Sequence, residues 1–251
     1  MRCGIISLIF KKKGDKRFLK NYRPISLLQV DYKILAKVMA NRFKQILCKI
    51  VSKCQSCCIP GRDIADTIAN IRDVLDLIEN EELEGYLLKM DQEKAFDKVG
   101  HIYLREVLKK YGFGDRFINW VGIFYTDIQS SVKSNGFFTK YFKIKNGIRQ
   151  GCPISALLYV LSAEPLQCAI RNNLNIEGIN IPNCDEKAVI FQHADDTTLT
   201  LCNKESINET LNIFEIYGKA SGSKINMSKS EIMCIGKANI NVSEIQQIGL
   251  K

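Results

Sequence analysis

Residues 188–201 read A-V-I-F-Q-H-A-D-D-T-T-L-T-L, and the interpretation of the whole chain depends on this stretch. Two runs rich in Val, Ile, Phe, Thr and Leu flank an acidic pair, which is typical of a β-hairpin with its turn at the two carboxylates, Asp195 and Asp196. Adjacent negative charges repel, so keeping both ionised requires solvent or a cation, and a divalent metal is the obvious candidate. The alternative is a solvated Asp-Asp turn without a ligand.

The composition limits the kind of protein. With 251 residues and 46% hydrophobic content, the chain can bury a sizeable core as one large domain or two small ones. The formal net charge of +9 favours a polyanionic partner, because clustered Lys and Arg attract phosphates. No apolar run is long enough to cross a bilayer, so we expect no membrane partner.

Ten cysteines are scattered along the chain without a secretory signal, which is typical of reduced thiols in an intracellular protein. Only Cys54, Cys57 and Cys58 form a tight cluster. A tetrahedral zinc site needs two ligands beyond a C-x-x-C pair, and neither a second C-x-x-C nor an H-x-x-x-H follows. We therefore expect no zinc site.

The first third of the chain predicts a strand, a basic loop and two helices. The apolar run 5–10 precedes a loop rich in Lys and Arg that returns at 22–24, and such a loop is either a solvated face or a grip for phosphates. Apolar residues then recur at helical spacing over 31–51 and 64–78. Arg62, after a Pro-Gly turn, is either a surface residue or a backbone contact.

The second half of the chain alternates helical and strand patterns. Asn135-Gly136 between apolar runs is a strong hairpin signal, and a basic glycine-containing loop leads into a helix that Pro153 opens. The expected helices are 101–111, 115–125, 154–171 and 205–220, and the expected strands are 128–132, 137–144 and 231–235.

The strand expected at 83–90 ends at Asp91. Strand ends often present catalytic carboxylates, because the sheet fixes the backbone while the side chain projects beyond it. An N-cap for the following helix is the alternative role. Asp91 and Asp195 are far apart in the sequence, so only the fold can bring them together.

Two-metal phosphoryl transfer requires such a pairing, because carboxylates from two elements hold divalent ions about 4 Å apart. One ion lowers the pKa of an attacking hydroxyl, and both neutralise charge on the phosphate. Mg²⁺ prefers carboxylate, water and phosphate oxygen. We therefore expect two Mg²⁺ ions, with Mn²⁺ as the substitute.

Six segments, taken in order, carry a resemblance to a known family. They read L-I-F-K-K-K-G-D with N-Y-R-P-I-S-L-L, Q-S-C-C-I-P-G-R, M-D-Q-E-K-A-F-D, N-G-I-R-Q-G-C-P-I-S, H-A-D-D-T-T-L and S-G-S-K-I-N-M-S-K-S-E. Over nearly its whole length the chain resembles the reverse transcriptase domain of non-LTR (LINE-type) retrotransposons. The intron and telomere types of reverse transcriptase match N-Y-R-P-I-S-L-L and K-A-F-D less closely.

The resemblance implies a metal site and a catalytic lysine. Lys229 matches the lysine that protonates the pyrophosphate leaving group, and Lys224 is its competitor. The implied metal-binding positions are Asp91, Asp195, the neighbouring Asp196 and the backbone carbonyl of Gln92.

The resemblance also implies a nucleotide site. Phe96 matches the aromatic residue that crowds the sugar 2′ position, where a rigid ring excludes a 2′-hydroxyl and admits deoxyribose. Gln150 and Gly151 match the loop along the incoming base pair. Lys13 and Arg23 match the residues that grip the triphosphate.

Several positions depart from the family pattern. His193 stands where the family nearly always has Tyr, and Gly100 replaces an expected acid. Cys57 and Cys58 replace the usual Gly-Phe, and Gln92 stands where an aromatic is common. None of these changes removes a metal ligand, but together they resemble drift in a copy under weak selection.

The expected fold class is α/β (α+β): right-hand polymerase fingers and palm, with the thumb missing. An antiparallel palm sheet presents Asp91 and Asp195 on one face and is backed by the helices 154–171 and 205–220. The expected boundaries are fingers at 1–84, palm at 85–236 with a fingers insertion around 112–150, and a truncated tail at 237–251.

The implied activity is RNA-directed DNA polymerisation, in which dNMP is added to a primer 3′-hydroxyl. The implied partners are an RNA template, a DNA primer and dNTPs. An intracellular location follows, nuclear when the chain is part of a full-length element. The alternative is a catalytically decayed remnant of a retrotransposon that at most binds RNA.

Overall fold

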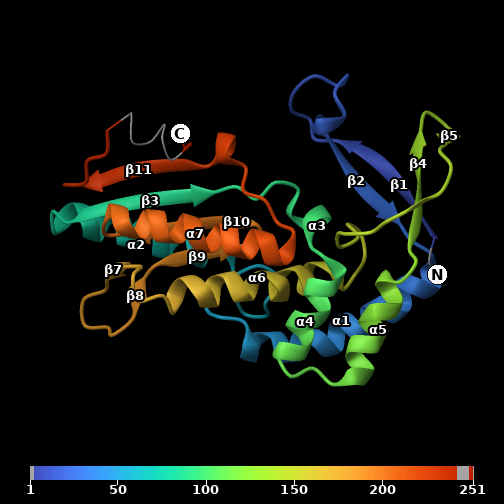
Figure 1. Ribbon diagram of the computed structural model, residues 1–251, viewed down its shortest axis with the longest axis horizontal. Coiled ribbons are helices and arrows are strands. Elements are labelled where there is room, and N and C mark those ends of the chain that lie inside the picture. The colour runs from blue at the N-terminus through green and yellow to red at the C-terminus, as the bar shows by residue number, and fades with distance from the viewer. Residues whose placement is uncertain (1–2, 242–248, 251) are drawn as a thin grey trace. The chain divides into compact units, whose positions relative to one another are not determined.

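The computed structural model describes residues 3–241 and 249–250 (Figure 1). The chain forms two compact units, one from residues 1–46 and 96–159 and the other from residues 47–95 and 160–251. Each unit contains its own main β-sheet. Within the described ranges, no helix combines the length and the apolar character needed to span a bilayer.

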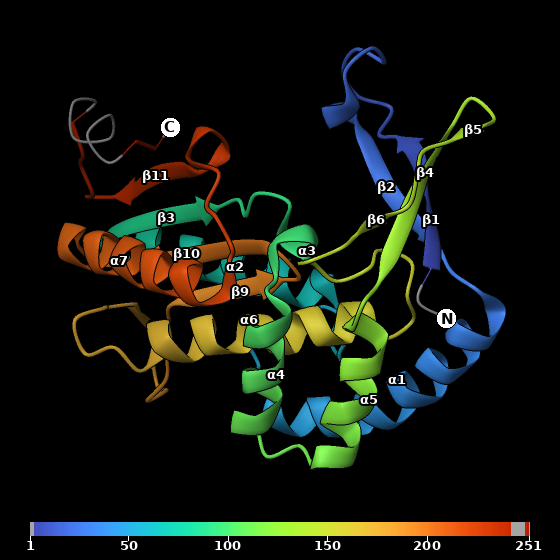
Figure 2. The ribbon, with the colours of Figure 1, turned by 45° about the vertical axis from the view of Figure 1, so that its right-hand side comes forward.

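The first unit contains a five-stranded sheet of order β2-β1-β4-β5, with β6 also paired to β4. β1 pairs antiparallel with β2 and parallel with β4, and the three strands lie side by side in Figure 2. Asn135 and Gly136 both have positive φ, 48° and 84°, as a two-residue type I′ turn requires, so the predicted hairpin is confirmed. The strands are β1 (Cys3–Phe10), β2 (Tyr22–Leu27), β4 (Gln129–Ser134), β5 (Phe137–Phe138) and β6 (Phe142–Lys143).

The helices of the first unit pack through aromatic side chains. Tyr32 and Phe124 have ring centroids 5.0 Å apart, and Phe43 packs against both Phe113 and Phe117 at 5.3 Å. The unit also holds the short 3₁₀ helix η1 (Leu19–Asn21). The helices are α1 (Val30–Ile50), α3 (Ala95–Lys98), α4 (His101–Lys110) and α5 (Asp115–Tyr125), together with the start of α6 (Ser155–Arg171).

The second unit is built on a four-stranded antiparallel sheet of order β11-β3-β10-β9. Its central strands have apolar, β-branched or aromatic residues that favour the pleated conformation. The second unit also contains a separate two-stranded antiparallel sheet, β7-β8. The strands are β3 (Glu84–Met90), β7 (Ile179–Asn180), β8 (Lys187–Ala188), β9 (Ile190–His193), β10 (Asp196–Leu201) and β11 (Glu231–Gly236).

Helices cover this sheet on both faces. Tyr86 and Leu88 of β3 are fully buried and point to the face covered by α6 and α7 (Lys204–Ser221). Leu87 points to the other face, where it packs against Val74 and Ile78 of α2 (Ile64–Asn80). Figure 1 shows α7 in front of the sheet and α2 behind it. The backing by 154–171 and 205–220 was predicted; the cover by α2 was not.

The predicted elements are confirmed to within a few residues at their ends. The reasons are local: α2 begins at a capping box formed by Asp63 and Asp66, and α7 ends at Gly222, which has a φ of 83°. The expected strand 137–144 is interrupted between β5 and β6. Residues 242–248 and 251 of the expected tail lie outside the described residues.

Candidate active site

Two strand ends bring acidic side chains together in the second unit. The antiparallel ladder between β3 and β10 ends with Met90 opposite Thr197. Continued by one residue, this register sets Asp91 opposite Asp196. Directly opposite residues point to the same face of a sheet. Asp91 and Asp196 therefore lie together beyond the sheet edge, on the face whose other end α2 covers.

The hairpin between β9 and β10 differs by one residue from the prediction. His193 pairs with Asp196, so the two-residue turn consists of Ala194 and Asp195, and Asp196 begins β10. Ala194 has a φ of 56°, in the left-handed region that an alanine rarely adopts. A positive φ at the first turn residue alone matches a type II′ turn. Only Asp195 of the two acids therefore lies in the turn.

Asp195 lies in an environment that disfavours its negative charge. Burial of the half-buried side chain is the largest effect that raises the pKa of Asp195, and the carboxylates of Asp196 and Asp91 raise it further. The positive character of His193 opposes this shift. The carboxylates of Asp91 and Asp196 therefore act electrostatically on Asp195, and a bound cation would relieve that repulsion.

A lysine-bearing turn is fixed to the end of β3. The backbone of Asp91 donates its N–H to Ser230 Oγ (3.1 Å) and accepts the N–H of Asn226 at its carbonyl (2.8 Å). Between these contacts lies the 3₁₀ helix η2 (Met227–Lys229). Lys229 Nζ lies 3.7 Å from Asp91 Oδ2. Lys224 instead contacts the end of β3 through its backbone, because its carbonyl accepts the N–H of Glu93 at 2.7 Å.

Gln92 is held by the same segment. It forms an antiparallel bridge with Ile225, and the two hydrogen bonds of that bridge come from the flanking peptide groups of Glu93 and Asp91. The side chain of Gln92 is 5% exposed, and its Oε1 accepts the hydroxyl hydrogen of Ser223 at 2.9 Å. Gln92 is therefore a buried polar side chain held through its side-chain oxygen.

Gln55 holds the acidic turn and was not predicted from the sequence. It is fully buried, and its Oε1 accepts the N–H groups of Ala194 and Cys57, both at 2.9 Å. Its Nε2 donates to the carbonyl of Ala194 (3.4 Å) and to Gln192 Oε1 (3.2 Å). One side chain thus satisfies both backbone groups of the residue with positive φ.

Two further glutamine contacts extend this support into α6 and β10. Gln167 Nε2 donates to Gln192 Oε1 at 2.6 Å, and Gln192 Nε2 donates to Thr197 Oγ1 at 2.9 Å. All three side chains are buried. Fully satisfied buried networks fix one conformation, so the turn has little freedom to move away from this geometry.

Arg62 explains how the Gln55 loop keeps its shape. Its guanidinium donates to the backbone carbonyls of Val51, Ser52 and Gln55. Of the two roles that the sequence left open for Arg62, the structure therefore shows the backbone contact. Several charge-assisted bonds from one planar group hold the loop rigidly.

The predicted nucleotide-binding residues all lie in the first unit. Phe96 is half-buried and stacks on Tyr159, with centroids 4.5 Å apart and planes inclined by 15°. Gln150 accepts the N–H of Ser26 at its carbonyl (2.8 Å). Gly151 has a φ of 103°, and an added Cβ would lie 2.7 Å from the Ser26 carbonyl oxygen, so only glycine fits there.

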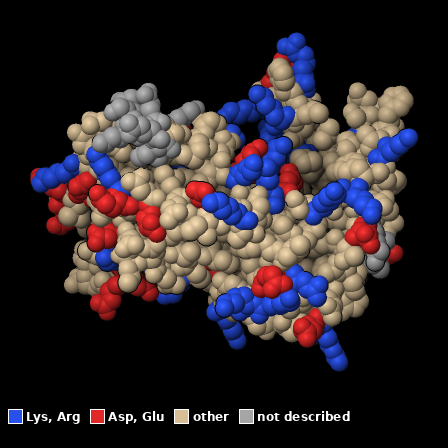
Figure 3. Space-filling model, viewed as in Figure 1, with Lys and Arg blue, Asp and Glu red and all other residues tan. Residues whose placement is uncertain are grey.

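Lys13 and Arg23 belong to the first hairpin of the same unit. Lys13 lies in the exposed loop that joins β1 to β2, and Arg23 is exposed on β2 opposite Ile9. Figure 3 shows Lys and Arg side chains gathered on this loop. The structure thus places both residues on an exposed basic surface, which suits contact with phosphates.

The acidic site fits a magnesium centre that is completed by substrate. Within residues 3–241 and 249–250, no three His, Cys, Asp or Glu side chains are gathered tightly enough to form an ion cage. Mg²⁺ typically binds through one or two carboxylates, with waters and substrate phosphates as its remaining ligands. Asp91 and Asp195 supply hard oxygen donors of that kind. Burial is the main effect that raises the pKa of Asp195, and the carboxylates of Asp196 and Asp91, whose repulsion a cation would relieve, raise it further.

Comparisons with known proteins agree with this geometry. The family model described as reverse transcriptase (RNA-dependent DNA polymerase) matches residues 10–251. The chain is 38% identical over 240 residues to the transposon TX1 uncharacterized 149 kDa protein of Xenopus laevis, covering 96% of this chain and 18% of that protein. It is 24% identical over 226 residues to the Pol polyprotein of the retrotransposable element R2 of Popillia japonica, covering 88% of this chain and 31% of that protein.

The chain therefore spans less than a third of either relative. Among solved structures, telomerase from Candida tropicalis matches 95% of this chain and 41% of its own, with a TM-score of 0.66 and 16% identity. This likeness confirms the predicted right-hand polymerase fold. Together with the family match and the retrotransposon relatives, it shows that the chain belongs to the reverse transcriptase (RNA-dependent DNA polymerase) family.

Proposed function

We propose that this chain is the fingers and palm part of an RNA-directed DNA polymerase that adds dNMP to a primer 3′-hydroxyl. The observation that carries the proposal is the convergence of Asp91, Asp195 and Asp196 at the ends of β3 and the β9–β10 hairpin, beside Lys229. In this assignment the sheet of the second unit serves as the palm and the sheet of the first unit as the fingers. As part of a full-length element, the enzyme acts in the nucleus.

Each residue of the site has a role in this reaction. Asp91 and Asp195, with Asp196 and the carbonyl of Gln92, would hold two Mg²⁺ ions, which when bound activate the attacking hydroxyl and neutralise phosphate charge. Lys229 donates a proton to the leaving pyrophosphate. The buried glutamines keep Asp195 in place, so that little reorganisation is needed during the reaction.

A primer-extension assay tests the proposal. The 251-residue chain is supplied with an RNA template, an annealed DNA primer, dNTPs and Mg²⁺. We expect extension that stops when EDTA removes the metal. Tight RNA binding without extension under Mg²⁺ or Mn²⁺ would contradict the proposal and indicate a decayed remnant.

Lys229 and Lys224 can be distinguished by substitution. We expect Lys229→Gln to slow single-turnover extension by about 10²-fold, because the leaving group loses its proton donor. Lys224→Gln is the matched control and should have a much smaller effect, since Lys224 contacts this segment through its backbone. A larger loss in Lys224→Gln would reverse the assignment.

Phe96 is proposed as the sugar gate. We expect Phe96→Val to raise the ratio of ribonucleotide to deoxyribonucleotide incorporation by at least about 10-fold, because the ring that crowds the 2′-hydroxyl is removed. Phe113→Val is the control, since Phe113 is also half-buried and stacked in the first unit. Equal ratios in parent and Phe96→Val, measured by competition between the two nucleotides, would contradict this role.

The β4–β5 hairpin supports a single-stranded nucleic acid partner. Four aromatic side chains from β5 to the start of β6 are well exposed: Phe137 (80%), Phe138 (56%), Tyr141 (55%) and Phe142 (44%). Lysines surround them, and Lys133 Nζ lies 5.7 Å from the centroid of the Phe138 ring. From residue 128 to residue 150 the chain contains four Lys, one Arg and no acidic residue. Exposed aromatics combined with positive charge are typical of surfaces that stack unpaired bases.

Removing two of these rings tests that role. We expect the double variant Phe137→Ala/Tyr141→Ala to weaken binding of a single-stranded RNA oligonucleotide by about 10-fold or more, because each stacked base contributes on the order of 1–3 kcal/mol. Fluorescence anisotropy measures the change. Leu174→Ala, which removes a 97% exposed apolar side chain, is the control. Unchanged affinity in the double variant would exclude stacking on this hairpin.

A further inference from the structure

Cys57 and Cys58 form a pair of thiols in contact. Their Sγ atoms are 3.4 Å apart, with Cys57 half-buried and Cys58 exposed. In an extended chain successive side chains point to opposite sides. Cys58 has a φ of 60°, which breaks that alternation and lets both sulfurs face each other.

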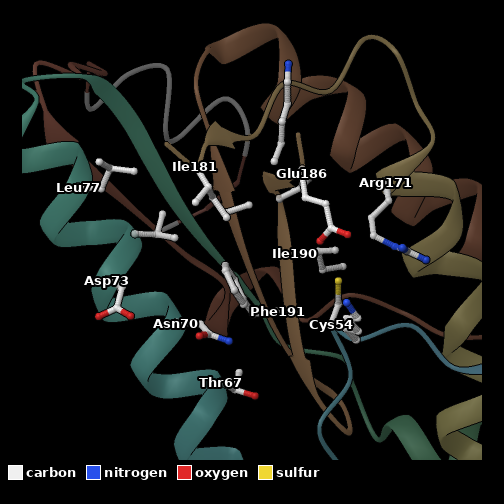
Figure 4. A pocket seen from close by; sticks show the side chains of 15 residues that line it. Cys54, Thr67, Asn70, Asp73, Leu77, Arg171, Ile181, Glu186, Ile190 and Phe191 are labelled. Atoms are coloured by element: carbon white, nitrogen blue, oxygen red, sulfur yellow. The ribbon is translucent and has the colours of Figure 1, made fainter. Parts of the chain in front are cut away.

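The third cysteine of the cluster does not join this pair. Cys54 lines a cavity of about 410 Å³ between α2 and the β8–β9 region (Figure 4). Among the described residues, no group of three His, Cys, Asp or Glu side chains that could hold a metal ion includes the two sulfurs. The two adjacent thiols form a dithiol through the contact of their sulfurs.

The spacing of the two sulfurs favours a one-atom bridge over a direct disulfide. Consecutive Cα atoms are about 3.8 Å apart, which is below the usual range of about 4.4–6.8 Å for disulfides. A disulfide would also require the sulfurs to approach to about 2.05 Å. A soft, thiophilic atom that bonds both sulfurs avoids this closure. Trivalent arsenic is an atom of that class that binds pairs of thiols.

The dithiol is coupled to the acidic turn by two contacts. The N–H of Cys57 and the N–H of Ala194 share the same acceptor, Gln55 Oε1. Next to Cys57, the hydroxyl of Ser56 lies 3.0 Å from His193 Nδ1. A group bound to both sulfurs would therefore perturb the segment that holds the acidic turn in place.

The acidic site also acts electrostatically on the Cys57–Cys58 dithiol. Contact with Cys58 is the largest effect that raises the pKa of Cys57, burial adds to it, and the carboxylate of Asp195 raises it further. Asp195 therefore lies within electrostatic range of Cys57. A raised pKa also keeps Cys57 protonated and slow to react with alkylating reagents, since the thiolate is the form that attacks them.

We propose that the Cys57–Cys58 dithiol is a binding site for trivalent organoarsenicals, and that its occupation inactivates the acidic turn. With phenylarsine oxide, the As=O bond breaks and two As–S bonds form. The two thiol protons leave with the oxygen as one water, and no electrons are transferred. Binding stands on the thiol geometry alone, whereas inactivation also rests on the proposed polymerase function.

Intact-mass measurement tests binding without reference to activity. We expect the 251-residue chain, treated with one equivalent of phenylarsine oxide, to gain one phenylarsenic group. Cys58→Ser and Cys57→Ser should each lose that adduct while remaining folded by thermal melting. Cys184→Ser, which alters another exposed cysteine, should bind as the parent does. An adduct that persists in both Cys57→Ser and Cys58→Ser would overturn the site.

Primer extension tests the coupling to the turn. We expect the reagent to reduce extension by the parent at least about 10-fold, and an excess of a small dithiol to restore it by competing for arsenic. Extension by Cys58→Ser, compared with its own untreated sample, should not change. A fully occupied parent with unchanged extension would overturn the coupling. Absence of extension before any reagent is added would instead count against the proposed function, and the mass measurement would still decide the binding site.

Discussion

An Asp195→Asn variant should extend a DNA primer on an RNA template at least about 10³-fold more slowly than the parent chain. Asparagine keeps the size of the side chain but removes the charge that would hold a cation next to Asp91 and Asp196. Single-turnover extension in Mg²⁺ measures the loss. Asp185→Asn, which neutralises an exposed acid in the same unit, is the matched control and should retain the parent rate.

The same variant should not be less stable than the parent. Burial and the neighbouring carboxylates raise the pKa of Asp195, so the folded state holds the proton more tightly than the unfolded state does. Stability is therefore lost as the pH rises through the window between the ordinary and the raised pKa, and it stays lower at pH 7. Removing the charge abolishes this loss, so the melting temperature of Asp195→Asn at pH 7 should equal or exceed that of the parent. Slow extension combined with a clearly lower melting temperature would mean that the variant failed by unfolding.

Gln55→Ala should damage both the stability and the rate. The substitution leaves the N–H groups of Ala194 and Cys57 and the carbonyl of Ala194 without their buried partner. An unsatisfied buried group costs about 1–3 kcal/mol, so for three such groups we expect a destabilisation of at least about 3 kcal/mol. Urea-induced unfolding measures it. Asn70→Ala, which shortens an exposed side chain of α2 in the same unit, should change stability by less than about 0.5 kcal/mol.

The kcat of folded Gln55→Ala shows whether Gln55 positions the acidic turn in addition to stabilising the fold. At a temperature where the variant remains folded, we expect Gln55→Ala to lower kcat at least about 10-fold with little change in KM for dNTP, because Asp195 is displaced while the nucleotide contacts remain. Parent-like kcat in a folded Gln55→Ala variant would show that the turn keeps its geometry without Gln55.

Local patterns in the sequence were sufficient for most of the fold. Helical periodicity located α1, α2, α6 and α7, and the Asn135-Gly136 signal located a hairpin that both positive φ values confirm. The acidic hairpin was placed one residue too far along, because Asp is a common turn residue whereas Ala with positive φ is rare. The exception is possible here because Gln55 binds both backbone groups of Ala194.

The long-range parts of the site could not be obtained from periodicity. The register of β3 against β10 places Asp91 opposite Asp196, but no local pattern specifies which strands pair across such a separation. Gln55, Gln167 and Gln192 give no signal either, because an isolated glutamine is most often exposed. Their role appears only when buried polar groups are matched with their partners. Lys229 was identified through the resemblance, and its ion pair with Asp91 then followed from the turn that holds it.

Binding of Mn²⁺ to a complex of the chain with RNA template, dideoxy-terminated DNA primer and dNTP tests the central claim most directly. The dideoxy end prevents the reaction, so electron paramagnetic resonance counts the ions that the assembled site holds. The account predicts two tightly bound Mn²⁺ ions in the parent and their loss in Asp91→Asn and Asp195→Asn, with both variants folded. Equal binding of Mn²⁺ by the parent and by these two variants would contradict it.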